Sequence, residues 1–237
     1  MPAPTVEAIA RHPHLAAPLA DGWVRVDMHS HTMWSGDSTT TPDEIARSVE
    51  ACGIDVLCIT DHNAIKGAVE LARHLPCRVI IGEELKTHAG EIIGLFLDER
   101  IPIGVPPAEA ARLIRAQGAL VYIPHPFDPM RRNLTEPSMR SLADDGMIDA
   151  IEVLNAKTSL QSLNRKAAAF AEEFDLPGGA GSDAHVPLAL GSAYVEMPDF
   201  DGPVDFLAQL RLAHPIGHHW DHARPWSARI VPSTTAH

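Results

Sequence analysis

The feature that most constrains the fold is a repeated alternation of short apolar strands and amphipathic helices between residues 21 and 213. Roughly seven such repeats are predicted, and each crossover helix returns the chain to the same strand direction, which predicts an α/β fold with a parallel sheet. A chain of 237 residues fits one closed barrel as a single unit. An open doubly wound sheet is the alternative, but it would bring fewer strand ends to one point.

Histidines and carboxylates gather where the predicted strands end. They occur in five short segments, at residues 27–31, 60–63, 82–84, 124–126 and 181–185. A strand puts every second side chain on one face, so Asp27, His29 and His31 are expected to point one way, and Asp183 and His185 to point together. The carboxyl ends of barrel strands share a face, where we expect these segments to meet. Imidazole and carboxylate without thiolate suit zinc, manganese or iron, and so many ligands indicate more than one ion.

The chain divides into three segments by composition. Residues 1–20 are rich in Ala and Pro and are expected to be a poorly specified lead-in, without the pattern of a secretory signal. Residues 21–213 are expected to form one barrel domain. Residues 214–237 are rich in Pro and His and are expected to form a loop-like tail.

The acidic balance restricts the partners. A formal net charge of −12, from 19 basic and 31 acidic residues, disfavours a long nucleic acid as partner. No apolar run is long enough to cross a membrane. Cys52, Cys58 and Cys77 show no zinc-binding spacing and are expected to be free thiols in a reducing cytosol. We therefore expect a cytoplasmic protein with a small substrate, and the sequence leaves the oligomeric state open.

In their order and their residues, the five segments resemble the polymerase and histidinol phosphatase (PHP) family. The resemblance runs from residue 27 to residue 185 and extends slightly through 190–193. It implies a distorted (βα)7 TIM-like barrel with two to three divalent metal ions (Mn, Fe or Zn) at the C-terminal ends of the strands. It also implies hydrolysis of phosphate esters by attack of metal-bound hydroxide.

The resemblance further implies three groups of metal ligands, with Glu84, rather than its neighbour Glu83, as a bridge between two of them. The first group is His29, His31, Glu84 and Asp183. The second is Glu84 and His125, and the third is Asp37, His62 and His185. Many relatives carry a histidine where this chain has Glu91. Glu91 is therefore either a harder ligand of the second metal or a residue that lies beside that site.

Other polar residues near these segments are expected to support the site. Asp27 and Asp61 are expected to orient histidines rather than to ligate. His185 is also a candidate proton donor to the leaving group. Cationic and amide side chains suit phosphate binding, and the candidates are Arg131, Arg132, Lys157 and Asn155.

Together these features favour a metal-dependent phosphoesterase, a phosphatase or phosphodiesterase, that acts on a small phosphorylated metabolite or on a mono- or dinucleotide. One alternative is a metal-dependent amide or ester hydrolase on a similar barrel, although no lysine stands at the strand end which that class uses. The other is a non-catalytic, metal-stabilised module, against which the near-complete ligand set argues.

Overall fold

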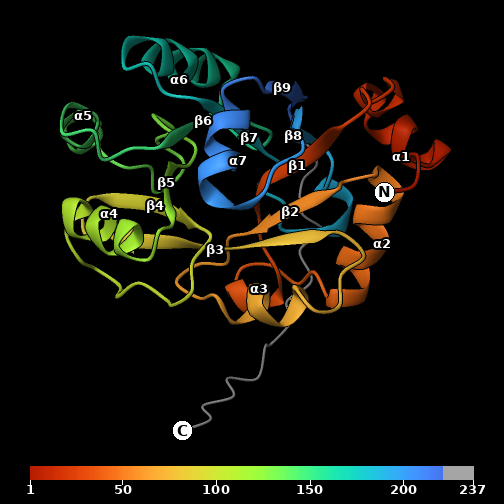
Figure 1. The fold of residues 1–237 in the computed structure, drawn as a ribbon, viewed down its shortest axis with the longest axis horizontal. Helices are drawn as coiled ribbons and strands as arrows, with labels where there is room; N and C mark the ends of the chain where they lie inside the picture. Colours follow the sequence, from red (N-terminus) through yellow and green to blue (C-terminus); the bar gives the residue numbers. More distant parts are fainter. Residues whose placement is uncertain (221–237) are drawn as a thin grey trace, which may run out of the picture.

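The structure, a computed structural model, describes residues 1–220, so the part of the predicted tail from residue 221 onward lies outside the described residues. The strands are β1 (Trp23–Ser30), β2 (Val56–Ile59), β3 (Arg78–Thr87), β4 (Gly90–Leu95), β5 (Leu120–Ile123), β6 (Ala150–Asn155), β7 (Gly178–Gly181), β8 (Ala193–Pro198) and β9 (His214–Gly217). They form one sheet in the order β7-β6-β5-β4-β3-β2-β1-β8-β9. The sheet curls into a nearly closed barrel (Figure 1).

Helices surround this sheet. They are α1 (Val6–Arg11), α2 (Pro42–Cys52), α3 (Lys66–Leu71), α4 (Pro107–Ala116), α5 (Glu136–Asp144), α6 (Gln161–Glu173) and α7 (Gly202–Leu210), with 3-10 turns η1 (Pro13–Ala16), η2 (Met33–Ser35) and η3 (Pro187–Ala189). The predicted start of α2 is confirmed: Thr41 and Glu44 form a reciprocal capping box, and Pro42 occupies the first turn. No helix within residues 1–220 has the length and apolar character needed to cross a membrane.

The prediction of a parallel sheet is wrong for half of the strand pairs. β1, β2 and β3 run parallel, as do β5, β6 and β7. However, β4 is antiparallel to both β3 and β5, and β8 is antiparallel to β1 and β9. β3 continues past Gly82 to Thr87 and returns through a tight hairpin as β4. The Thr87 hydroxyl donates to the Gly90 carbonyl, and Gly90 has φ 127°, which closes the hairpin.

The barrel closes between its first and seventh strands. The first half of β1 pairs with β8, from Trp23 to Val26. Its second half lies beside the end of β7, where Asp183 N donates to His29 O at 2.8 Å and His31 N donates to Ala184 O at 3.0 Å. The absence of a side chain at Gly181 permits this approach, because a Cβ there would press on Cβ of His29.

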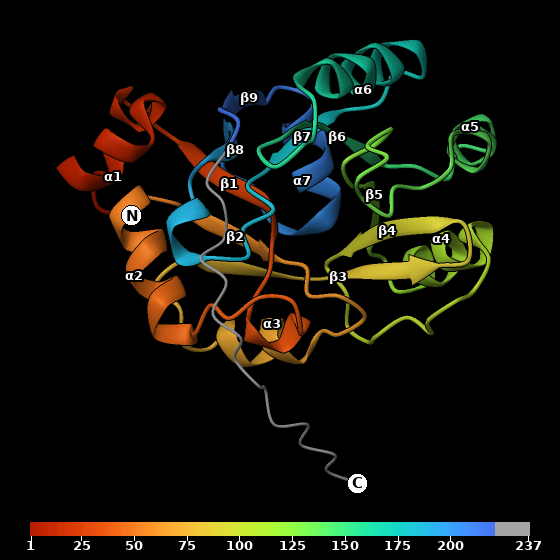
Figure 2. The same ribbon diagram turned by 180° about the vertical axis from the view of Figure 1, so that it is seen from behind.

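Apolar side chains fill the barrel and its outer layers. Inside, Val26, Met28 and Tyr122 pack with Phe206 and Leu210 of α7. α7 lies across one end of the ring of strands, in front of it in Figure 1 and behind β1 and β7 in the opposite view of Figure 2. α4, α5 and α6 cover the β4–β6 side, and α2 and α3 cover the β2–β3 side.

Both ends of the described chain are more ordered than the sequence predicts. α1 and η1 occupy the expected lead-in, where Ala8 and Leu15 are buried in a core cluster. The first residues of the expected tail form β9, which pairs with β8. Local composition gave no sign of either element, since both depend on packing against the barrel.

Candidate metal centre

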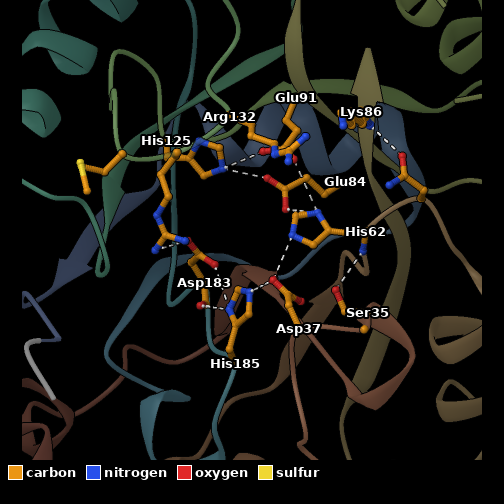
Figure 3. Close-up of a pocket in the computed structure, with 14 residues that line it drawn as sticks. Ser35, Asp37, His62, Glu84, Lys86, Glu91, His125, Arg132, Asp183 and His185 are labelled. Carbon is orange, nitrogen blue, oxygen red and sulfur yellow. Dashed lines mark hydrogen bonds and ion pairs between the residues drawn. The ribbon is translucent and has the colours of Figure 1, made fainter. Parts of the chain in front are cut away.

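Ligands predicted from all five segments converge on one open pocket (Figure 3). The predicted ligands that line it are Asp37, His62, Glu84, Glu91, His125, Asp183 and His185. His29 and His31 are buried and lie beneath them, within contact distance of Glu84. The strand-end pattern therefore identified side chains from distant parts of the sequence that the fold brings together, such as His29 and Asp183, whose Nε2 and Oδ1 lie 3.9 Å apart.

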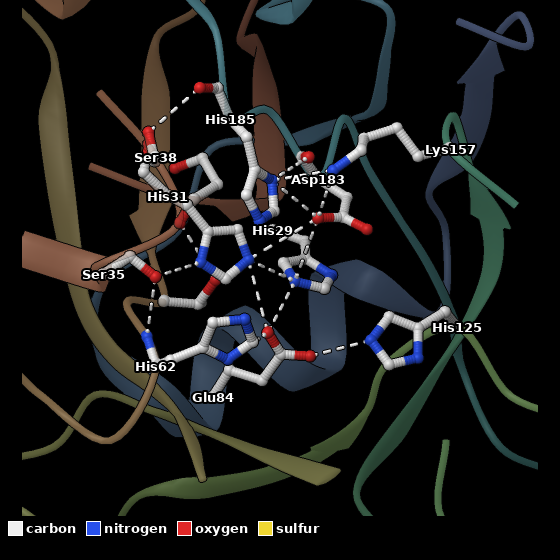
Figure 4. A network of polar contacts seen from close by, with 12 residues as sticks. His29, His31, Ser35, Ser38, His62, Glu84, His125, Lys157, Asp183 and His185 are labelled. Carbon is white, nitrogen blue, oxygen red and sulfur yellow. Dashed lines mark hydrogen bonds and ion pairs between the residues drawn. The ribbon is translucent and has the colours of Figure 1, made fainter. Parts of the chain in front are cut away.

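Glu84 is the centre of the network (Figure 4). Its Oε2 lies 3.4 Å from His29 Nε2, 3.3 Å from His31 Nε2 and 3.2 Å from His62 Nδ1. Its Oε1 lies on another side, 2.8 Å from His125 Nε2. The two oxygens of one carboxylate thus face two different groups of nitrogen donors, which is the arrangement that a bridging ligand requires.

Asp37 organises a further group of donors. Its Oδ2 lies 2.9 Å from His185 Nε2 and 3.3 Å from His62 Nε2. The ring centroids of His31 and His185 are 4.2 Å apart, so His31 borders this group as well. Asp183 Oδ1 lies 3.6 Å from His31 Nε2, on the side of the first expected group.

Among residues 1–220, three sets of donor atoms lie close enough together to hold a metal ion, with all atoms of a set within 4.8 Å of one another. They are His29, His31 and Glu84; Glu84, Glu91 and His125; and His31, Asp37, His62 and His185. The sets resemble the expected partition, but Asp183 belongs to none of them, Glu91 joins the second and His31 is shared by two. Glu91 is buried, and its oxygens lie 3.8 Å from His62 Nδ1 and 3.9 Å from His125 Nε2.

The ionisation states of these histidines and carboxylates suit the binding of a metal cation. Burial, together with the nearby His185, lowers the pKa of His31 to about 3, which leaves a neutral imidazole able to ligate. Burial alone would lower the pKa of His62, but Asp37 and Glu84 raise it to about 9. Burial opposes ionisation of Glu84, yet His29 and His125 hold its pKa well below the usual range. Protons on histidine thus balance the buried carboxylates, and a metal ion would replace them.

Two of the expected ligands are held in backbone conformations that L residues rarely adopt. His125 has φ 29° and Asp183 has φ 48°. The amide of His125 donates to Glu152 Oε2 at 2.6 Å, and the amide of Asp183 donates to His29 O at 2.8 Å. These bonds hold both residues so that their side chains face Glu84 and the buried histidines.

Glu152, which the sequence did not identify, supports several of these groups. It is fully buried in β6 and lies 3.2 Å from His29 Nδ1 through Oε1. Its Oε2 also accepts from Asn155 Nδ2 at 2.9 Å. A carboxylate on the outer nitrogen of a ligating histidine fixes the ring and makes it a better donor. The available signal was one acidic residue within the otherwise apolar segment 150–154.

Asp27 and Asp61 act on the backbone rather than on imidazole rings. Asp27 Oδ1 accepts from His29 N at 3.2 Å and from Ser182 N at 3.0 Å. The pairing of β1 shifts register between Asp27 and Ser30, which breaks the simple alternation that grouped Asp27 with the histidines. Asp61 accepts from both the amide and the hydroxyl of Thr32 at 2.6 Å, and so fixes the loop after His31.

The predicted substrate contacts fall into different places. Arg131 and Lys157 flank Asp183. Arg131 Nη2 lies 3.2 Å from Asp183 Oδ2, and Lys157 Nζ lies 3.4 Å from Asp183 Oδ1. Lys157 Nζ also lies 2.8 Å from His185 Nδ1. Arg132 lines another part of the pocket. Asn155 is buried and bonded to Glu152, so the structure gives it a positioning contact rather than a place on the pocket wall.

Comparisons with known proteins agree with this geometry. The family model for the PHP domain matches residues 27–137, and a PHP-associated model matches residues 161–214. One uncharacterized protein of Methanocaldococcus jannaschii is 39% identical to this chain, over 56% of this chain and 82% of its own length. A second uncharacterized protein of the same organism is 35% identical over 80% of each chain. A probable phosphatase of Acetivibrio thermocellus is 45% identical over 23% of each chain.

A solved structure shares the fold. It is a two-domain protein of Bacteroides vulgatus that contains a predicted PHP-like metal-dependent phosphoesterase. It superposes with a TM-score of 0.64 at 19% identity, over 85% of this chain and 67% of that one. The ordered motifs, the barrel and these matches together show that the chain belongs to the PHP family.

Proposed function

We propose that the protein is a metal-dependent phosphoesterase that hydrolyses a small phosphorylated metabolite or nucleotide. The observation that carries the proposal is Glu84, whose two oxygens join two donor groups beside cationic side chains. Nitrogen and oxygen donors without thiolate suit two to three ions of manganese, iron or zinc. When bound, such ions supply charge neutralisation of the phosphate and activation of water.

The chain's own residues would bind and orient the substrate. Arg131 presents a planar guanidinium beside Asp183, a geometry suited to bidentate contact with two phosphoryl oxygens. Lys157 adds a point charge on the same side of the pocket. His185 is our candidate for delivering a proton to the leaving oxygen, because Lys157 Nζ lies 2.8 Å from its Nδ1 and can resupply that atom.

A small substrate and a cytoplasmic location are part of the proposal. The net charge of −12 favours a compact substrate over a long nucleic acid. Cys52, Cys58 and Cys77 are buried free thiols, which is the state expected in a reducing compartment.

The test is release of phosphate from an aryl phosphate by protein loaded in turn with manganese, iron or zinc. We expect activity that a chelator abolishes and that His31→Ala and Asp183→Ala remove, whereas Arg73→Gln, an exposed change in the loop after α3, retains it. Full activity in metal-stripped protein would refute the proposal. Cleavage of aryl esters or amides, without phosphate release, would favour the amide or ester hydrolase. Bound metal without any hydrolysis would favour the structural module. A panel of phosphate monoesters, diesters and cyclic diesters would then identify the substrate class.

A further inference from the structure

The cationic side chains of the pocket fall into two sets. Arg131 and Lys157 are both engaged with Asp183. Lys86 and Arg132 also line the pocket and are exposed. Within residues 1–220, neither Lys86 nor Arg132 has a side-chain ion pair or hydrogen bond. The first set is therefore already paired with Asp183, where the scissile phosphate is proposed to bind, while the second set is available to another group.

Backbone pairing places Lys86 and Arg132 on either side of Glu91. Lys86 lies directly opposite Glu91 in the β3–β4 hairpin, so the two side chains project to the same face. Arg132 O accepts from Glu91 N at 2.8 Å, and Asn133 forms a bridge with Glu91. Figure 3 shows Lys86, Glu91 and Arg132 along one side of the pocket, opposite Asp183 and His185.

The Glu91 carboxylate does not form an ion pair with either of these two cations. Its oxygens lie near His62 Nδ1 and His125 Nε2, toward the centre, at 3.8 and 3.9 Å. Among the described residues, no ion pair of 4.0 Å or less joins the Glu91 carboxylate to the side chain of Lys86 or of Arg132. An anion of the protein thus lies between two cations without pairing with either, and the charge of both remains directed at the pocket mouth.

The position of Lys86 along β3 gives the distance between the Lys86–Arg132 pair and Glu84. Lys86 follows Glu84 by two residues on the same face of β3, which places their Cα atoms about 7 Å apart. A group bound between Lys86 and Arg132 would therefore lie one short spacer away from a phosphate held at Glu84 and Asp183.

We propose that Lys86 and Arg132 form a second anion subsite, and that the substrate is a phosphate ester carrying another anionic group, a carboxylate or a second phosphate, on its leaving side. This inference rests on the proposed function for the place of the scissile phosphate. It makes Lys86 and Arg132 specificity-determining residues, which select a doubly anionic substrate over a neutral alcohol phosphate.

Binding of non-hydrolysable phosphonates tests the subsite without requiring turnover. Manganese-loaded protein is titrated by calorimetry with phosphonopropionate and with propylphosphonate, which has similar length but no second anion. Propylene bisphosphonate distinguishes a second phosphate-like group from a carboxylate. Exposed charge pairs are each worth about 0.2–1 kcal/mol, so each cation should contribute roughly a 1.5- to 5-fold preference for the doubly anionic ligands.

Matched variants assign any preference to the two residues. Lys86→Gln and Arg132→Gln should each reduce the preference, and the double variant should abolish it, while the affinity for propylphosphonate stays within about twofold. Arg73→Gln removes the same charge far from the pocket and should retain the preference. Equal affinity of parent protein for the matched ligands would overturn the subsite, as would equal losses for both ligands in the variants. Failure of phosphate release with the preference intact would instead count against the proposed reaction alone.

Discussion

Replacement of Glu152 by Gln should weaken metal binding although residue 152 is not expected to touch the metal. Glu152 is fully buried and carries three contacts: His29 Nδ1 at 3.2 Å, His125 N at 2.6 Å and Asn155 Nδ2 at 2.9 Å. Gln has nearly the same shape but only one acceptor oxygen and no charge. It can satisfy the His29 side or the His125 side of this arrangement, but not both.

The contacts set the expected magnitude. Loss of the partner on the outer nitrogen of a ligating histidine typically reduces metal affinity by about 10- to 100-fold, which corresponds to roughly 1.4–2.7 kcal/mol. If the Gln oxygen instead remains with His29, its NH2 group faces the amide of His125, and that buried donor loses its acceptor at a cost of about 1–3 kcal/mol in stability. Either orientation is therefore unfavourable, through affinity in one case and through folding in the other.

The assay is a competition titration with a chromophoric chelator, combined with thermal melts of metal-free protein. Glu83→Gln is the matched control, since Glu83 is equally buried on β3 but faces away from the centre and accepts from Ile101 N at 2.8 Å. We expect Glu83→Gln to retain the parent affinity. A Glu152→Gln protein with unchanged affinity and unchanged melting temperature would refute the role assigned to this residue.

Three further results are expected. Glu91→His should raise metal occupancy of the set that contains Glu84 and His125, and an unchanged metal count and affinity by elemental analysis and titration would place residue 91 outside the coordination sphere. The pKa of His62 is raised to about 9, so its protonation stabilises the metal-free fold fully below about pH 6.5, and this contribution is lost as pH rises toward 9. In the presence of chelator, His62→Gln should therefore flatten the dependence of melting temperature on pH over this range. An identical slope in parent and variant would contradict the contribution assigned to His62. Gly181→Ala should destabilise the protein by about 1–3 kcal/mol, because the new methyl meets Cβ of His29. Denaturant melts that show no loss of stability would argue against a tight closure.

The candidate ligands could be identified from sequence because their chemistry is local. A histidine or carboxylate at the end of an apolar strand is visible without knowledge of the fold, and the barrel then brings Glu84 and Asp183 to within 3.3 and 3.6 Å of His31 Nε2. The antiparallel return of β4 was not visible, because two adjacent glutamates after Gly82 indicate a strand end. In the structure Glu83 and Glu84 lie within the strand and point to opposite faces.

Supporting contacts were harder to predict than ligands, since they depend on register. Asp27 was grouped with His29 by simple alternation, and the register shift in β1 directs it to backbone amides instead. Glu152 is 123 residues from His29, and only the pairing of β6 with β5 and β7 brings it beneath the histidines. Neither relation follows from periodicity within one segment.

Because the candidate metal centre lies at the closure between β1 and β7, metal binding there would also affect the folding of the chain. His29 and His31 lie on one side of the joint, Asp183 and His185 on the other, and the hydrogen bond between Ser182 N and Asp27 spans 155 positions of sequence. Ions shared by these residues would act as a covalent crosslink does, by restricting a very long loop in the unfolded chain. If the centre binds metal as proposed, it would therefore also hold the two ends of the barrel wall together.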